Sequence, residues 1–556
     1  MNIEILRKRI FTKMAIKIIQ LTHQHRNLKT MTNKGLILFC FVITSTLSLA
    51  QNKFINVLEY DIHLSVNDDN NIIEVVENVQ IEFTENCSSF QLDLVSEDKN
   101  GTGMTVLSCR EYSDTISFRH VNDTLTLFPN HGHVGDVMVY EIIYRGIPAD
   151  GLVIGENKFN QRTFFGDNWP NRARNWIACN DHPSDKALVH FSVEAPDYYE
   201  VVSNGIKTEE KSILGNRKKT VYRTEYELPT KVMVVGIADF VIKELYAQEN
   251  TILTSWVYPE DETNGFKDME VAKDPFQFFV KNIGPYPFEK LANVQSTTRF
   301  GGMENAGCIF YDENAVKGEG TMENLIAHEI AHQWFGNSAS ESDWCHLWLS
   351  EGFATYFTNL HIEHKYGRDA MNSQLEKDKN RIIKFSKQFN RPLVDTITTN
   401  LMQLLNPYAY QKGSWVLHML RHKIGDELFW LGIRKYYDTY KYSNASSEDF
   451  ISIMETMSEH DLADFFNQWL KRDYHPQLKI SKKNKCKGKL LTIEQVQNGE
   501  LFHIDLEVEI VLKDGTTKIE TITDLGRLKK IKLRDNQKII QINIDPNNNL
   551  LYEKIN

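Results

Sequence analysis

Two histidines stand four residues apart in the stretch HEIAH, as His328 and His332. In a helix this spacing places both imidazoles on one face, one turn apart, where they can bind the same metal ion. Glu329 lies about 100° around the helix from His328, so it is poorly placed as a further ligand but can reach water at the metal. The pattern predicts a metal site with a general base beside it.

A third ligand is offered by Glu351 in the stretch WLSEGFATYF, which follows His332 after 18 intervening residues. Two histidines and one glutamate leave one tetrahedral position open, which is typical of catalytic rather than structural zinc. We therefore predict one Zn²⁺ per chain, bound by His328, His332 and Glu351. Taken alone, Glu351 would be an ordinary acid in the first turn of a helix, where the helix dipole favours it.

Two other histidine pairs have similar spacing, His418 with His422 and His361 with His364. Neither pair has an acid directly after its first histidine, and neither has a partner carboxylate at a telling distance. We interpret them as surface histidines or as buried histidines whose hydrogen bonds are satisfied.

A lone carboxylate, Glu304, lies upstream of HEIAH in the glycine-flanked stretch GGMENAG. The glycines at 301, 302 and 307 are expected to let the backbone approach a ligand closely, because glycine has no side chain to obstruct it. What the carboxylate of Glu304 binds is not evident from these residues alone.

The elements that must position these residues follow from the hydrophobic periodicity. Apolar and polar residues alternate from Tyr60 onwards with turn residues between the runs, which predicts antiparallel strands over roughly residues 52–245. After about Pro275 apolar residues recur every three or four positions, as in helices. Alternation returns in residues 476–556, where Asp514-Gly515 indicates a hairpin in a small β-sandwich.

Length and composition set the class of protein. A chain of 556 residues has room for about three or four domains. Its 41% hydrophobic and 25% charged residues are typical of a globular protein without a membrane-embedded domain. The net charge of −11 argues against nucleic acid as a partner, because phosphate backbones favour basic surfaces.

Four stretches in this order, GGMENAG, HEIAHQWFGN, WLSEGFATYF and YAYQKG, resemble the M1 zinc aminopeptidases, the gluzincin family of aminopeptidase N and leukotriene A4 hydrolase. The resemblance extends from about residue 55 to the end and implies a short, three-domain, bacterial-type form. It implies a multidomain α+β protein in which an N-terminal all-β domain, a thermolysin-like and mainly helical catalytic domain and a small β-sandwich follow one another. We place their limits at residues 51–245, 246–475 and 476–556.

The resemblance also assigns roles to residues. Glu329 would be the general base and later the general acid, and Glu304 would bind the free α-amine of a peptide substrate. The neighbours of Glu304 would then be substrate-binding residues as well; they are Gly301, Gly302, Met303 and Asn305. Tyr410, two residues before Lys412-Gly413, would donate to the oxyanion, whereas without the resemblance it would be taken for ordinary packing at a helix start.

A weaker part of the resemblance lies in the β region, in GDNWPNRARNWIACNDHPSDKA. Matched on Ala173-Arg174 and Pro183, it sets Asp167 and Trp169 on the Gln and Glu of the family pattern. In relatives this region gives the amine a second polar contact, and Asp167 is the acid left to make it. The stretch departs from the pattern at Ala178 and His182.

These assignments imply an exported zinc aminopeptidase that acts on peptides with a free N-terminus. A thermolysin-like endopeptidase would share the zinc ligands but has no use for an amine-binding acid such as Glu304. Epoxide hydrolysis occurs in one branch of the family, and nothing in the sequence favours it. A binding scaffold without catalysis is disfavoured because the base and all three ligands are present. The oligomeric state and the preferred first residue are not evident.

The N-terminal residues predict export to a periplasm or out of the cell. Lys34, an apolar run from Leu36 to Val42 and a small-residue end at Ser48-Leu49-Ala50 form a signal peptide cut near Ala50, with an uncleaved anchor as the alternative. Residues 1–30 precede it, and translation is expected to start at Met31. After cleavage no membrane span is expected. Cys87 and Cys109, both in the β region, are either buried thiols or a disulfide.

Overall fold

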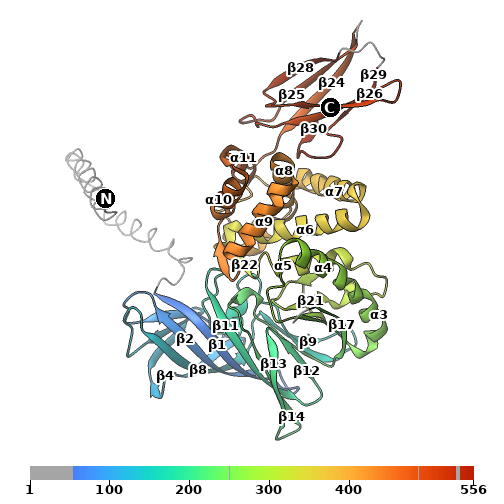
Figure 1. Ribbon diagram of the computed structural model, residues 1–556. Helices are drawn as coiled ribbons and strands as arrows, with labels where there is room; N and C mark the ends of the chain where they lie inside the picture. Colours follow the sequence, from blue (N-terminus) through green and yellow to red (C-terminus); the bar gives the residue numbers. More distant parts are fainter. Residues whose placement is uncertain (1–53, 249–250, 486–487, 534–538, 556) are drawn as a thin grey trace, which may run out of the picture. The chain divides into compact units, whose positions relative to one another are not determined.

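A computed structural model describes residues 54–248, 251–485, 488–533 and 539–555 (Figure 1). The predicted signal peptide, its cleavage near Ala50 and the start at Met31 lie outside the described residues. Within the described ranges no helix combines the length and the apolar content that a membrane span requires.

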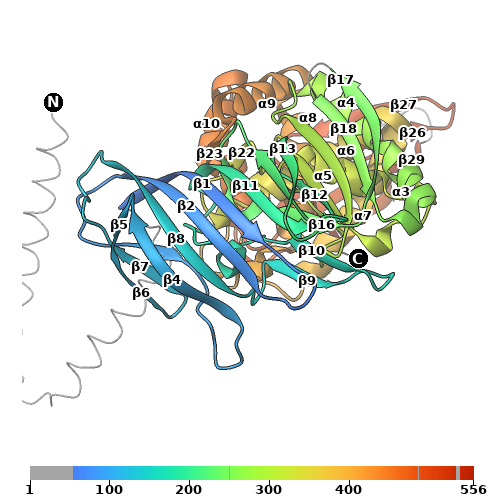
Figure 2. The same ribbon diagram turned by 90° about the horizontal axis from the view of Figure 1, so that it is seen from below.

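The first part of the chain is built of strands, as its period-two pattern predicted. In β1 (Ile55–Ser65) the side chains of Tyr60, Ile62 and Leu64 are buried and alternate with more exposed ones. β1 pairs antiparallel with β2 (Ile73–Phe83) and parallel with β11 (Lys186–Pro196), at the centre of a large twisted sheet (Figures 1 and 2). The other strands of this sheet are β4 (Gly103–Glu111), β5 (Asp114–Thr115), β8 (Val137–Ile147), β13 (Ile206–Ile213), β14 (Arg217–Arg223) and β15 (Leu228–Pro229).

Two smaller sheets complete this β region. One has the order β12-β16-β10-β9 and the other the order β3-β7-β6. The bounds of the first are β9 (Leu152–Glu156), β10 (Arg162–Gly166), β12 (Glu200–Ser203) and β16 (Val235–Ala238). The bounds of the second are β3 (Phe90–Asp93), β6 (Ser117–Val121) and β7 (Thr124–Phe128). Cys87 and Cys109 are free thiols, so the alternative of a disulfide between them is wrong.

A five-stranded sheet, which the sequence pattern did not predict, opens the middle part of the chain. Its order is β17-β18-β19-β21-β20, with β18, β19 and β21 parallel. The bounds are β17 (Val241–Gln248), β18 (Thr251–Val257), β19 (Lys290–Ser296), β20 (Gly302–Met303) and β21 (Cys308–Asp312). Successive residues of β19 and β21 are buried, so these strands show no alternation of buried and exposed positions. The predicted limit at residue 245 cuts through the β17–β18 hairpin.

The rest of this middle part is mainly helical, as predicted. Two helices carry the sequence motifs, α5 (Glu323–His332) and α6 (Trp348–Tyr366), and they pack against each other. The other helices are α3 (Glu262–Met269), α4 (Lys273–Asn282), α7 (Arg368–Ser386), α8 (Gly413–Ile424), α9 (Asp426–Tyr440), α10 (Ser447–Ser458) and α11 (Ala463–Lys471). A short parallel pair, β22 (Ala339–Glu341) with β23 (Ser443–Ala445), ties the segment after α5 to the segment after α9.

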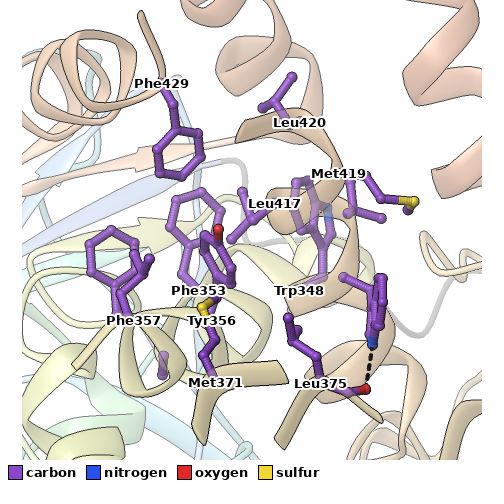
Figure 3. Close-up of a cluster of buried hydrophobic side chains, with 14 of the residues drawn as sticks. Trp348, Phe353, Tyr356, Phe357, Met371, Leu375, Leu417, Met419, Leu420 and Phe429 are labelled. Carbon is purple, nitrogen blue, oxygen red and sulfur yellow. Dashed lines mark hydrogen bonds between the residues drawn. The ribbon is translucent and has the colours of Figure 1, made fainter. Parts of the chain in front are cut away.

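Helix α6 lies at the centre of the helical core. Fifteen of its residues, from Trp348 to Ile362, are buried without interruption. Figure 3 shows Phe353, Tyr356 and Phe357 of α6 among side chains from α7, α8 and α9. This packing on all sides fixes the position of α6 and therefore of Glu351 in its first turn.

The last part of the chain forms two β-sheets, as predicted for a sandwich. One has the order β28-β25-β24-β30 and the other the order β27-β26-β29. Buried residues of both sheets, among them Leu491, Ile493, Val508 and Ile542, belong to one apolar cluster. The bounds are β24 (Gln477–Lys485), β25 (Gly488–Gln495), β26 (Leu506–Leu512), β27 (Thr517–Ile522), β28 (Leu528–Leu533), β29 (Ile539–Ile544) and β30 (Glu553–Ile555).

Candidate active site and metal centre

The structure brings His328, His332 and Glu351 together. The Nε2 atoms of the two histidines are 3.1 Å apart, and Oε2 of Glu351 lies 3.3 Å from each of them. A tetrahedral ion with bonds of about 2.0 Å separates its ligand atoms by about 3.3 Å. The three atoms therefore form a triangle of the size that a zinc ion requires, on the side of α5 that faces the start of α6.

The imidazole of His332 is oriented by groups behind it. Its Nδ1 lies 3.2 Å from the carbonyl oxygen of Phe335 and 3.1 Å from the hydroxyl of Ser350. A proton on Nδ1 that is donated to the carbonyl leaves the lone pair of Nε2 directed at the metal position. The ring of His328 stacks on Tyr410, with centroids 5.9 Å apart and planes 13° apart.

The carboxyl group of Glu329 packs against the backbone of Gly302. A methyl group added at Gly302 would lie 2.4 Å from Oε1 of Glu329. The glycine in the GGMENAG stretch thus makes room for the predicted general base, which is a more specific reason than the close approach to a ligand that the sequence suggested. Burial raises the pKa of Glu329, and the neighbouring acids Glu304 and Glu351 add to this shift.

We expect the substitution Gly302→Ala to lower kcat by about tenfold or more while the protein stays folded, because a misplaced catalytic group costs about that much or more. The matched control is Gly301→Ala, where the nearest atom to the added methyl is Cδ1 of Leu325 at 3.9 Å. Steady-state kinetics of both variants, with thermal unfolding to compare stability, measure the effect. Equal losses of kcat in the two variants would contradict a specific clash with Glu329.

Glu304 follows β20 directly, and its backbone is fixed by the segment after α5. The side-chain amides of Gln333 and Asn337 donate to the carbonyl oxygen of Glu304, at 2.8 Å and 2.6 Å. Oε1 of Gln333 also accepts from the backbone N–H of Gly307 at 2.9 Å. Gln333 and Asn337 belong to the quoted stretch HEIAHQWFGN, but nothing in the sequence showed that their partner is a backbone carbonyl.

The three possible metal ligands, Glu304 and Glu329 line one cavity of about 250 Å³. Its polar lining consists of Glu304, His328, Glu329, His332, Glu351 and Tyr410. Its apolar lining consists of Trp169, Phe300, Met303, Leu325 and Leu405, with Gly301 and Gly302 between. Ligand atoms of Glu304, Glu329 and His332 lie within 4.8 Å of one another, so the predicted base and the predicted amine-binding acid are neighbours. Burial raises the pKa of Glu304 as well.

Tyr410 comes from a π-helical turn, Tyr408–Lys412, that leads into α8. This turn approaches α6 so closely that Cβ atoms on Gly352 or Gly413 would lie within 3 Å of the other residue's Cα. Two facing glycines thus let the elements that carry Glu351 and Tyr410 come together. Tyr408, two residues earlier, packs against Phe385 instead and is not on the cavity lining.

Two predicted substrate-binding residues do not line the cavity. Asp167 is fully buried, and its carboxylate accepts from Arg172 at 2.6 Å and lies 3.5 Å from Arg299. Both of its oxygens are engaged by arginines, so the structure does not bring Asp167 to the lining beside Glu304. Asn305 is also fully buried and lies off the lining. Trp169, near Asp167 in sequence, lines the cavity and was not predicted to do so.

The rival histidine pairs do not form metal sites among the described residues. His418 is buried, with Nδ1 3.2 Å from the hydroxyl of Tyr356 and Nε2 3.2 Å from the carbonyl oxygen of Asn548. His422 and His364 are exposed, and His361 is buried among aromatic rings. The interpretation as surface histidines or buried, satisfied ones holds for His364, His418 and His422. It is wrong for His361, whose buried Nδ1 has no hydrogen-bond partner.

The chain is similar in sequence to proteins that are named as aminopeptidases. A protein of Sulfurisphaera tokodaii, named "Probable aminopeptidase 2", is 28% identical over 399 residues, which cover 67% of this chain and 49% of that protein. The glutamyl aminopeptidase of Homo sapiens is 27% identical over 332 residues, or 57% of this chain and 34% of that protein. The chain thus spans about half, or less, of the length of these relatives.

Two solved structures share the fold. Aminopeptidase A of Legionella pneumophila, in complex with aspartic acid, superposes with a TM-score of 0.76 at 16% identity, covering 92% of this chain and 60% of that one. A mutant of the M1 zinc metallopeptidase of Deinococcus radiodurans gives 0.63 at 22% identity, covering 76% and 96%.

Family models match both of the regions that build the site. The Peptidase M1 N-terminal domain matches residues 56–232, which include Trp169 on the cavity wall. The Peptidase family M1 domain matches residues 267–469, which include the ligand triangle, Glu304, Glu329 and Tyr410. With the sequence motifs, the ligand geometry and the fold in agreement, this chain belongs to peptidase family M1.

Proposed function

We propose that this chain is a zinc aminopeptidase, which removes single residues from the free N-terminus of peptides. One observation carries the proposal: the carboxylate of Glu304 shares a cavity of about 250 Å³ with the ligand triangle and Glu329. A cavity of this size is smaller than the roughly 300–1,000 Å³ of sites for drug-sized ligands, so it suits a single residue.

The charges of the cavity support the same function. Glu304, Glu329 and Glu351 place three carboxylates on one small lining. Oε1 of Glu304 is buried without a hydrogen-bond partner within the protein, which is costly unless a ligand supplies one. The two charges of a divalent cation and the single charge of a substrate ammonium would neutralise three carboxylates. A metal together with an amine therefore complements this site.

The residues present support a hydrolytic mechanism. Zinc bound by His328, His332 and Glu351 would supply a Lewis acid that polarises the scissile carbonyl and makes water more acidic. Glu329 takes the proton of the attacking water and delivers it to the leaving amine. The hydroxyl of Tyr410 donates a hydrogen bond to the oxygen that gains negative charge. Glu304 holds the α-ammonium group and so fixes which bond is cut.

The alternatives lack a comparable observation. An endopeptidase with the same metal ligands would leave the buried oxygen of Glu304 without a partner, and no feature of the cavity favours an epoxide. We propose further that the protein is exported, on the strength of the apolar run Leu36–Val42 and the small residues that follow it.

Aminoacyl amides of a fluorophore, compared with their N-acetylated forms, test the proposal. We expect the free-amine substrates to be cleaved at least about a hundredfold faster, because acetylation removes the charge that Glu304 binds. A zinc chelator should abolish cleavage, and added Zn²⁺ should restore it. Since zinc binds the folded state, its removal should also lower the melting temperature.

Equal cleavage of blocked and free substrates would contradict an aminopeptidase and favour an endopeptidase. Full activity in the presence of the chelator, at verified zero metal content, would contradict the metal's part in the reaction. Inductively coupled plasma mass spectrometry of the purified protein gives the metal content, with an expected value of one zinc per chain.

A further inference from the structure

The cavity also has an apolar wall, to which the proposed mechanism assigns no role. Trp169 and Phe300 form this wall, with their rings edge-to-face at 6.3 Å and 88°. The other side of Trp169 packs edge-to-face on Trp344 at 5.8 Å, and only 2% of Trp169 is exposed. Met303 and Leu405 continue the apolar lining. The wall is therefore preformed and well packed.

This wall is where the first side chain of a substrate must lie. Glu304 is proposed to hold the α-amine, and the scissile carbonyl would lie at the ligand triangle. The α-carbon is bonded to both the amine nitrogen and the carbonyl carbon, so it must lie in the same cavity. The side chain on that carbon then has to occupy what remains of about 250 Å³. The polar lining is already assigned to amine, metal and water, so the surface left to it is aromatic and aliphatic, apart from the indole N–H of Trp169, which is buried without a hydrogen-bond partner.

No lysine or arginine belongs to the lining among the described residues. Arg172 and Arg299 are the arginines nearest in sequence to Trp169 and Phe300, and both form ion pairs with aspartates. Arg172 pairs with Asp167 at 2.6 Å and with Asp150 at 3.0 Å. Arg299 pairs with Asp150 at 2.6 Å. Neither cation is free to bind an acidic side chain of a substrate.

The same charge cluster holds the wall in place. Nε of Arg172 donates to the carbonyl oxygen of Trp169 at 2.7 Å, and its guanidinium lies 5.7 Å from the ring centre of Phe300. Asp167 fixes Arg172 and therefore both aromatic residues. This gives Asp167 a positioning role in place of the amine contact that the sequence suggested.

We infer that the site selects peptides whose first residue has an apolar side chain, such as leucine, methionine or phenylalanine, and that Trp169 and Phe300 determine this selectivity. The inference rests on the proposed aminopeptidase function. Acidic and basic first residues are disfavoured because their charges would be desolvated against aromatic and aliphatic surface, and an acidic one would also face three carboxylates.

Fluorogenic aminoacyl amides that differ only in the first residue test the inference on the wild-type protein. We expect kcat/KM for leucyl, methionyl and phenylalanyl substrates to exceed that for alanyl by about tenfold, since each added apolar group in such a pocket gains that order of discrimination. Glutamyl and lysyl substrates should be at least about a hundredfold poorer than leucyl. A glutamyl or lysyl substrate equal to leucyl would overturn the inference.

Variants of the wall connect the selectivity to these residues. Trp169→Ala should lower the ratio of leucyl to alanyl kcat/KM by about tenfold, whereas the conservative Trp169→Phe should keep most of it. Phe300→Ala, at a less buried position, gives the same test if Trp169→Ala does not fold. The control Leu431→Ala, exposed on α9, should leave the ratio within about twofold. An unchanged ratio in the folded wall variants would assign the selectivity to other residues.

Product binding gives a readout without catalysis. Free leucine and phenylalanine should raise the melting temperature in a concentration-dependent way, and glutamate at the same concentrations should not. The two proposals fail differently. Loss of all discrimination between free and N-acetylated substrates contradicts the aminopeptidase, whereas efficient cleavage of free glutamyl or lysyl substrates contradicts only the apolar preference.

Discussion

Glu329→Gln is expected to lower kcat by about a thousandfold while KM changes little, because general acid–base catalysis by a positioned side chain contributes about 10²- to 10⁴-fold. At the midpoint of that range, the loss corresponds to about 4 kcal/mol of transition-state stabilisation. Glutamine has nearly the shape of glutamate, so it fits beside Gly302, where the space for a larger group is absent. What it lacks is the ability to accept a proton from water and to return it to the leaving amine.

Two measurements separate this effect from damage to the site. Glu329 is outside the triangle of His328, His332 and Glu351, so the variant should retain one zinc per chain and the melting temperature of the wild type. His332→Ala, by contrast, should lose both the metal and the activity. A Glu329→Gln protein that binds zinc and turns over at the wild-type rate would remove Glu329 from the mechanism.

The approach of the two histidines was predictable because its geometry is local. A spacing of four residues places two imidazoles on one face of any helix, and the structure has their Nε2 atoms 3.1 Å apart. Glu351 needed more than periodicity, since an acid in a first helical turn is ordinary; it was the combined chemistry of two histidines and one glutamate that singled it out.

The rest of the site depends on contacts that no local pattern reports. Gln333 and Asn337 donate to a backbone carbonyl about thirty residues away. Every residue has such a carbonyl, so no residue type in the sequence identifies this partner. Asp167 was assigned by matching residue types, which does not show its ion-pair partners. Its carboxylate accepts from Arg172, five residues later. Successive residues of the parallel strands β19 and β21 are buried, and for that reason these strands lack the alternation that predicted strands elsewhere in the chain.

The position of Asp167 changes which carboxylates of the site could bind a substrate amine. The resemblance to the M1 aminopeptidases implied two acids for the substrate amine, Glu304 and Asp167. Because Asp167 is committed to arginines, the described lining leaves Glu304 as the carboxylate that is neither a metal ligand nor the predicted base. Under the proposed function, recognition of the amine would therefore depend on Glu304 alone, and loss of its carboxylate should have a correspondingly large effect on kcat/KM.

Glu304→Gln is accordingly expected to lower kcat/KM for free-amine substrates by about 100- to 1,000-fold, mainly through KM. Removing one partner of a buried charge pair costs about 2–5 kcal/mol, because the ammonium loses its counter-ion in a place that water does not reach well. The backbone at this position should keep its place, since its carbonyl is held by Gln333 and Asn337 rather than by the side chain.

The control for Glu304→Gln is an analogue in which a hydroxyl replaces the α-amine of the substrate. Wild type should strongly prefer the amine, and the variant should discriminate between the two by at least about tenfold less, since the preference arises from the charge of the carboxylate. Unchanged zinc content and an unchanged melting temperature would show that the metal triangle is intact. If KM and the discrimination were both unaffected in the variant, the α-amine would have to be recognised by a group other than Glu304, and the case against an endopeptidase would lose its main support.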